Sequence, residues 1–257
     1  MTRKLVKSDG STHLGKKSPA HSMSEKAQTG QYPPLDSTKI ATRAMYDALG
    51  AEGMRAWADE YEMDDELDFV LSRIGTAKVV LDLACGYGRT AIPLAARGLS
   101  VCGLDISESL IASARESAAK HNVPAQFDVG DICSLHLYPN QTFDHVLCLW
   151  SSFIHVVDEA EQLKCINEVH RVLKPGGGAT FVLTDPRLNY WQQRLSQTDG
   201  RIVNFEMVEG HCVPVFIHSE ASVRALLMSS EFESYDYAPQ VDDGKERLVL
   251  SMVKADH

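Results

Sequence analysis

The sequence predicts an α/β domain built on a doubly wound, mostly parallel sheet. Short runs rich in β-branched residues alternate with amphipathic helical patterns over residues 79–183. A glycine-rich turn, at Gly86 and Gly88, follows the first of these runs. Alternating strands and helices form right-handed βαβ units, which place their strands side by side in parallel. Residues 201–253 depart from this alternation and predict a hairpin, a helix and two further strands.

The elements of the alternating part follow from local signals. Ser107 can cap a helix because its side-chain oxygen accepts a free N–H of the first turn. Gly98 ends the preceding helix, and the run 174–178 (Lys-Pro-Gly-Gly-Gly) breaks the last one. The predicted strands cover residues 79–81, 100–104, 125–129, 143–149 and 179–183. The predicted helices cover residues 89–97, the segment after Ser107, and residues 159–173.

Further elements are predicted on both sides of this core. Before it, Ser37 begins a helix that stops at Gly50, and a second helix begins at Asp64 or Asp65 and ends at Gly75. Apolar residues at helical spacing support the second helix: Leu67, Val70, Leu71 and Ile74. After the core, the predicted elements are a hairpin of residues 201–208 and 213–218, a helix at 220–230, and strands at 232–238 and 246–253.

The composition excludes several classes of protein. The chain has 25 basic and 35 acidic residues, a net charge of −10 that would repel nucleic acid. No apolar run approaches the roughly 20 residues needed to cross a membrane, and the N-terminus lacks a secretory pattern. Six cysteines show neither CxxC nor zinc-site spacing. We therefore expect a cytoplasmic protein with reduced thiols, no metal, and no nucleic-acid or membrane partner.

The domain organisation is expected to be simple. Residues 1–36 are rich in Lys, Ser, Gly, Thr and Pro without periodicity, which predicts a disordered tail. Residues 37–257 then form one domain without internal repeats. The sequence leaves the oligomeric state open.

The glycine turn has two readings. As a bare pattern, Gly86-Tyr-Gly88-Arg-Thr-Ala91 is the G-x-G-x-x-A of dinucleotide-binding proteins, and Asp105 at the end of the next strand suits a ribose. This interpretation predicts an NAD(P)-dependent oxidoreductase. However, Asp82 lies at the end of the first strand, where its charge would repel a pyrophosphate. With Asp131 after the third strand, three acids at adjacent strand ends indicate a nucleoside without phosphates.

At this point the chain resembles the small-molecule branch of the class I S-adenosylmethionine-dependent methyltransferases. Residues 81–89, Leu-Asp-Leu-Ala-Cys-Gly-Tyr-Gly-Arg, are similar to the first motif of that branch, with Ala84 in place of its first glycine. The resemblance implies a Rossmann-like seven-stranded sheet of order 3-2-1-4-5-7-6, with strand seven antiparallel. Further matching segments are residues 101–107, 130–132, 143–149 and 170–178.

The resemblance also implies the cofactor, S-adenosyl-L-methionine (product S-adenosyl-L-homocysteine), and a set of residues around it. Asp105 would bind the ribose hydroxyls and Asp131 the adenine amine, whereas Asp144 is a solvent-facing turn acid. The implied cofactor residues are Tyr61, Asp82, Ala84, Gly86, Gly88, Arg89, Asp105, Ile106, Asp131, Ile132, Leu149 and Trp150.

In this branch the acceptor is bound by the N-terminal helices and by the segment after strand five. Here these are a helical lid, residues 37–76, and an insertion with the hairpin, residues 185–218. The candidate substrate-binding residues are Tyr46, Trp57, Tyr190 and Trp191. Each of these aromatic residues could instead serve only to pack its segment against the domain.

Methyl transfer from a sulfonium is an in-line displacement that needs alignment and removal of one proton. His155, in the loop after strand four, is the candidate base, although a structural role is an open alternative; His211 and His218 are weaker candidates. Residues 149–152 (Leu-Trp-Ser-Ser) lack the Asn/Asp-Pro-Pro-Tyr of enzymes acting on DNA bases or glutamine. We therefore expect N- or O-methylation of a small organic molecule, for example in natural-product tailoring. The alternatives are the oxidoreductase and a non-catalytic S-adenosylmethionine-binding protein.

Overall fold

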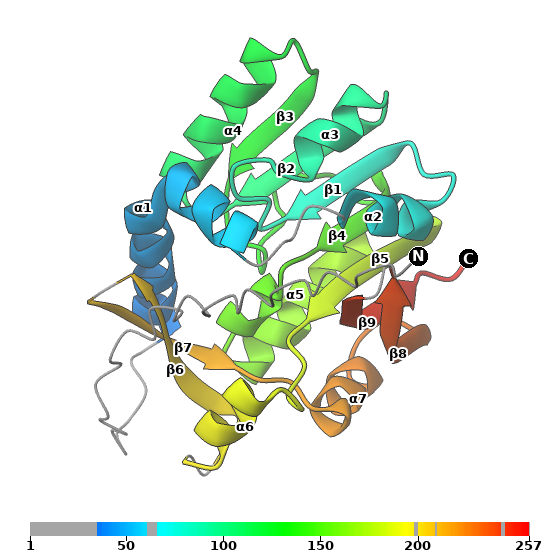
Figure 1. Ribbon diagram of the computed structural model, residues 1–257. Helices are drawn as coiled ribbons and strands as arrows, with labels where there is room; N and C mark the ends of the chain where they lie inside the picture. The colour runs from blue at the N-terminus through cyan, green and yellow to red at the C-terminus, as the bar shows by residue number, and fades with distance from the viewer. Residues whose placement is uncertain (1–34, 61–65, 198–199, 209, 243–244, 257) are drawn as a thin grey trace, which may run out of the picture. The chain divides into compact units, whose positions relative to one another are not determined.

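The computed structural model describes residues 35–60, 66–197, 200–208, 210–242 and 245–256. Its main feature is a seven-stranded sheet with the order β3-β2-β1-β4-β5-β9-β8 (Figure 1), and β6 and β7 form a separate two-stranded sheet. The strands are β1 Val79–Leu83, β2 Ser100–Asp105, β3 Ala125–Val129, β4 Phe143–Cys148, β5 Leu173–Leu183, β6 Ile202–Val208, β7 His211–Phe216, β8 Ser234–Asp242 and β9 Lys245–Val253.

The predicted strand order is confirmed. Strands β1 to β5 pair in parallel, and β9 pairs antiparallel with both β5 and β8. Since the hairpin strands β6 and β7 belong to the second sheet, β8 and β9 are the sixth and seventh strands of the main one. The carboxyl ends of β1 to β4 therefore meet at one edge, which is where open α/β sheets bind ligands.

Helices cover both faces of the sheet (Figure 1). Helices α2, α3 and α4 pack on one face and α5 and α7 on the other. The alternation within β1 fits this arrangement, because Val80 faces the first group while Leu81 and Leu83 face the second. The helices are α1 Leu35–Glu60, α2 Glu66–Ile74, α3 Ala91–Ala96, α4 Glu108–Lys120, the 3₁₀ turn η1 Ser152–His155, α5 Glu159–Val172, α6 Asn189–Leu195 and α7 Glu220–Met228.

Most predicted element boundaries agree with the structure within a few residues, and three details differ. Gly50 interrupts α1 with φ 62° and ψ 177°, as predicted, but helix resumes at once and continues to Glu60. The run 174–178 ends α5 at Val172, as predicted, but it lies within β5, where Gly176 has φ 70° and the pairing with β4 shifts register. Helix α6 and the turn η1 had no clear local signal. Most of the predicted tail, residues 1–34, lies outside the described residues.

A buried apolar cluster joins α1 to the hairpin. Helix α1 contacts both β6 and β7, and α6 contacts β6. The hairpin strands alternate so that Val213 and Val215 point into this cluster. The buried members are Met45, Ile154, Trp191, Val203, Val213, Val215 and Ile217. The cluster fixes α1 and the hairpin beside η1, at the carboxyl end of β4.

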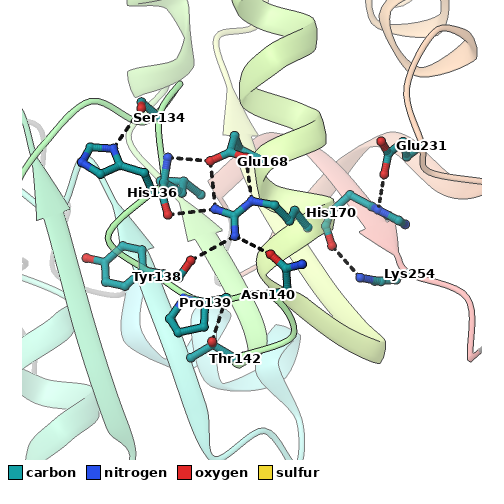
Figure 2. Close-up of polar contacts among 12 residues, drawn as sticks. Ser134, His136, Tyr138, Pro139, Asn140, Thr142, Glu168, His170, Glu231 and Lys254 are labelled. Atoms are coloured by element: carbon teal, nitrogen blue, oxygen red, sulfur yellow. Dashed lines mark hydrogen bonds and ion pairs between the residues drawn. The ribbon is translucent and has the colours of Figure 1, made fainter.

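Arg171 fixes the loop that leads into β4. Figure 2 shows the loop residues Tyr138 and Asn140 beside Glu168 of α5. The Arg171 guanidinium donates to the carbonyl oxygens of Leu135 and Tyr138 at 2.9 and 3.0 Å and to Asn140 Oδ1 at 2.8 Å. It also holds both carboxylate oxygens of Glu168, one of which accepts the Leu135 N–H. The motif at residues 170–178 therefore has a structural role, because its arginine joins α5 to the β3–β4 connection.

The cysteines and the lengths of the helices bear on the expected class of protein. All six cysteines are free, and four of them are buried. Among the residues that the structure describes, no helix has both the length and the apolar character needed to cross a membrane.

Candidate active site

The β1–α3 turn lies at the carboxyl edge of the sheet and has an unusual backbone. Ala84, Gly86 and Gly88 all have positive φ, at 54°, 55° and 80°. A Cβ on Gly88 would lie 2.9 Å from Ile92 Cδ1 and 3.1 Å from Phe127 Cζ, so only glycine fits there without displacement. Ala84 takes the strained conformation without being glycine. Such strain is concentrated at functional sites.

Asp105, at the end of β2, organises this turn. Its Oδ2 accepts the Gly86 N–H at 2.9 Å and its Oδ1 accepts the Ser107 N–H at 2.8 Å. Burial raises the pKa of Asp105 to about 6, although these two backbone hydrogen bonds lower it. Each carboxylate oxygen can accept a second hydrogen bond. The side chain is therefore placed to hold both the turn and a diol.

Asp82, near the end of β1, is buried and accepts a hydrogen bond from the Ala91 backbone at the start of α3. Burial, together with the charges of Glu66 and Asp105, raises its pKa to about 8. The carboxyl group therefore lies at the helix start, the place that a pyrophosphate occupies in dinucleotide-binding folds. A phosphate bound there would lie close to the buried carboxyl groups of Asp82 and Glu66.

The raised pKa of Asp82 predicts a pH-dependent stability. Between about pH 4 and pH 8 the folded state retains a proton that the unfolded state has lost, so stability falls as pH rises. Asp82→Asn should therefore stabilise the ligand-free protein by about 1–2 kcal/mol at pH 8. The gain should vanish below pH 4, which urea unfolding at several pH values would measure. An equal gain at pH 4 and pH 8 would contradict the titration.

Asp131, after β3, is engaged by helix α1. Its Oδ1 accepts the Cys133 N–H at 2.9 Å and its Oδ2 lies 2.6 Å from Lys39 Nζ. Glu161 Oε2 lies 2.7 Å from the same ammonium. Ligand atoms of Asp131, Cys133 and Glu161 lie within 4.8 Å of one another, and Lys39 supplies the positive charge that this cluster requires. Sequence reasoning did not find Lys39.

Apolar side chains accompany these acids. Ile106 and Ile132 follow Asp105 and Asp131 directly, and both are partly exposed at the same sheet edge. Leu149 is buried against the face that carries α2 to α4. This pattern gives the edge two accessible aliphatic side chains, which suits the faces of a planar ring.

A second cluster forms at the end of β4. The Trp150 indole N–H donates to the buried carboxylate of Glu66 on α2. Arg89 stacks over the Trp150 ring at 4.1 Å, and the Trp57 ring lies 5.4 Å from it. Trp150 and Ser151 have positive φ, at 56° and 59°, a strained pair. The predicted residue Tyr61 lies outside the described residues.

Glu66 was not identified from the sequence. Burial raises its pKa, while the Trp150 hydrogen bond and the charge of Arg89 lower it. Arg89 Nη1 is 3.8 Å from Glu66 Oε2. This Arg89 nitrogen is buried and has no hydrogen-bond partner among the described residues. A buried guanidinium nitrogen without a partner can bind an anionic group.

His155 and Tyr46 form a pair beside this cluster. Tyr46 is on α1, and its hydroxyl oxygen lies 2.8 Å from His155 Nε2. Burial lowers the pKa of His155 to about 4, so the ring is neutral at pH 7. The second ring nitrogen, Nδ1, is buried without a hydrogen-bond partner in the described part of the chain. A neutral imidazole with one nitrogen held and the other unpaired can exchange a proton there.

The other predicted residues take different places. Trp191 is buried in the cluster between α1 and the hairpin, whereas Tyr190 is exposed and has Arg194 over its ring. His218 is buried and stacks on Phe153 at 5.1 Å, and His211 begins β7. The Tyr190 ring also lies edge-on to Trp191, with ring centroids 4.7 Å apart. The ring centroid of Phe205 is 5.9 Å from that of Trp191 and 6.4 Å from that of His155.

Two features lie at the opposite, amino edge of the sheet. Asp144 accepts the Lys78 and Val79 N–H groups and pairs with Lys174, so it anchors strand starts. A groove of about 590 Å³ is lined by residues of α5 together with Glu231 and Lys254. Because α/β sheets bind ligands at carboxyl ends, neither feature belongs to the candidate site.

Comparisons with known proteins agree with this geometry. Residues 80–177 match the family model for a methyltransferase domain. A probable methyltransferase (ltbC) of Aspergillus luteorubrus is 31% identical over 123 residues, 44% of this chain and 42% of that protein. A fatty-acid O-methyltransferase of Mycolicibacterium smegmatis is 34% identical over 145 residues, 52% of this chain and 49% of that protein. The matches thus span less than half the length of these relatives.

Solved structures share the fold. Magnesium protoporphyrin IX methyltransferase of Synechocystis, solved with bound S-adenosylhomocysteine, is 21% identical with a TM-score of 0.60. The match covers 85% of this chain and all of that one. The family match over residues 80–177 is to a methyltransferase domain, and the strand order of the whole sheet is the one expected for S-adenosylmethionine-dependent methyltransferases of class I. The comparisons do not favour the interpretation of the turn as a dinucleotide site.

Proposed function

We propose that this protein transfers a methyl group from S-adenosylmethionine to a nitrogen or oxygen of a small organic molecule. The observation that carries the proposal is the single sheet edge that holds a strained glycine turn and three carboxyl groups, Asp82, Asp105 and Asp131. These groups favour a ligand with hydroxyls, an amine and positive charge over one with phosphates.

The residues present fit the adenosyl cofactor. We assign Asp105 to the ribose hydroxyls and Asp131 to the adenine amine, with Ile106 and Ile132 against the ring. Arg89 Nη1, which is buried and makes no hydrogen bond among the described residues, suits the methionine carboxylate. The remaining proposed contacts are Asp82, Ala84, Gly86, Gly88, Leu149 and Trp150, with Glu66 added from the structure. When bound, S-adenosylmethionine supplies a methyl group already activated on a sulfonium.

The acceptor site is proposed beside His155, under helix α1. Tyr46 holds Nε2 of this histidine, and Nδ1 faces away from that contact without a partner. Nδ1 would take the proton from an acceptor hydroxyl or ammonium. Tyr46 and the hairpin residue Phe205 supply aromatic surface around it. Trp57, whose ring lies against Trp150, stays a proposed acceptor contact. The named O-methyltransferase relative supports oxygen as one acceptor atom.

Calorimetry separates the proposal from its main alternative. S-adenosylhomocysteine should bind saturably, whereas NADH should not, because Asp82 already accepts the Ala91 N–H at the start of α3, where a pyrophosphate would bind. A panel of small hydroxy and amino compounds with S-adenosylmethionine labelled in the methyl group then tests transfer. Saturable binding of NADH alone would overturn the proposal. Binding of S-adenosylhomocysteine without transfer to any acceptor would favour a non-catalytic binder.

A further inference from the structure

Helix α1 places polar side chains along one face toward the carboxyl edge. Lys39, Arg43 and Asp47 are four residues apart, so they lie in a row. Arg43 Nη2 is 2.6 Å from Glu108 Oε1, and Asp47 Oδ1 accepts a hydrogen bond from the Ser107 hydroxyl at 2.5 Å. The row therefore contacts residues that follow β2 (Ser107 and Glu108) and β3 (Asp131).

Lys39 makes the strongest contact of the row. Its ammonium lies 2.6 Å from Asp131 and 2.7 Å from Glu161, and the three side chains are 28%, 28% and 16% exposed. The Arg43–Glu108 pair is 42% and 66% exposed, in the range where ion pairs contribute little. Partly buried charges are screened less by salt and solvent. Lys39 and Asp47, which accepts hydrogen bonds from Ser107 and Ser109, are therefore the main polar attachments of this row.

The charge states of Lys39 and Asp131 support an ion pair at pH 7. Burial alone would lower the pKa of Lys39, but hydrogen bonds to Asp131 and Glu161 outweigh it and raise this pKa above its ordinary value. Burial alone would raise the pKa of Asp131, but the hydrogen bonds from Lys39 and Cys133 hold it below its usual range. The pair is therefore ionised at pH 7.

The residues that hold α1 are also those that border the proposed cofactor. Ser107 donates its backbone N–H to Asp105 and its hydroxyl to Asp47 of α1. Asp131, assigned to the adenine amine, uses Oδ2 for Lys39. Ser107 and Asp131 therefore both attach α1 and border the proposed adenosyl site.

We propose that Lys39 is a positioning residue that latches α1 over the carboxyl edge, so that the adenosyl ligand exchanges only after its bridge to Asp131 and Glu161 has broken. The inference rests on the proposed function for the identity of the ligand. The latch itself rests on the contacts of α1.

Stopped-flow measurement of S-adenosylhomocysteine dissociation, followed by tryptophan fluorescence, tests the latch. Lys39→Met should raise the dissociation rate by about tenfold or more, and Glu161→Gln by a few-fold, since dissociation rates carry most affinity changes. Lys39→Arg should restore most of the wild-type rate. Lys164→Met is the matched control: Lys164 lies 3.5 Å from Glu161 but belongs to α5, and its side chain is 52% exposed.

Hydrogen exchange of the ligand-free protein gives a second readout that needs no ligand. In Lys39→Met, amides of residues 39–49 should exchange faster than in the wild type, while those of α4 should not. Unchanged dissociation and unchanged exchange in Lys39→Met, or equal effects in Lys164→Met, would overturn the latch. Failure of the wild type to bind S-adenosylhomocysteine would instead overturn the proposed function, and exchange would still test the latch.

Discussion

Replacing Asp105 with alanine should weaken binding of S-adenosylhomocysteine by about 100-fold, or roughly 2.7 kcal/mol. The change removes the proposed acceptor of the ribose hydroxyls. It also leaves the N–H groups of Gly86 and Ser107 without the carboxylate that holds them at 2.9 and 2.8 Å. The turn would lose its fixed geometry at the same time, which is why the expected loss exceeds that of a single hydrogen bond.

Calorimetry of the purified variant would measure this effect. Asp128→Ala is a suitable control, because Asp128 is an acid of the neighbouring strand β3 whose carboxylate accepts from Tyr138 and Gln126 rather than from the turn. It should leave the affinity within about threefold of the wild type. Equal affinities of the Asp105 variant and the wild type would contradict the placement of the ribose.

Replacing Arg171 with methionine should lower the free energy of unfolding by about 3 kcal/mol. The guanidinium satisfies the carbonyl oxygens of Leu135 and Tyr138 and the side chain of Asn140, and it pairs with Glu168 (Figure 2). Methionine keeps much of the aliphatic stem but none of these hydrogen bonds. The loop into β4 would lose its attachment to α5.

Urea unfolding followed by circular dichroism would measure the loss. Arg224→Met provides the comparison, because Arg224 pairs with Glu220 at 3.4 Å on an exposed helix surface. Such pairs contribute about 0–1 kcal/mol. Similar losses for both variants would show that Arg171 acts as an ordinary surface residue.

Local signals in the sequence determined most of the fold. The short apolar run Val79-Val80-Leu81 predicted a strand, and in the structure Val80 and Leu81 face different groups of helices. Ser107 caps α4 by accepting the Leu110 N–H, as its position predicted. Helix α6 was missed because its boundaries carry no such signal: Leu188 makes no side-chain cap.

The candidate site was predicted only in part from the same signals. The glycine turn and the acids at strand ends could be located, because strand periodicity and turn residues are short-range patterns. The partner of each acid could not. Lys39 is 92 residues from Asp131, Glu66 is 84 residues from Trp150, and a close approach between them has no local signature.

The sequence by itself therefore determined which strands form, their parallel arrangement, and the edge at which the acids gather. Hydrophobic periodicity and turn chemistry are sufficient for this, since each acts within a few residues. Only the tertiary structure decided which helix covers that edge and which side chains it brings there. That outcome depends on how α1 packs against the hairpin and the strand ends, because Tyr46 meets His155 across 109 residues only after both elements are in place.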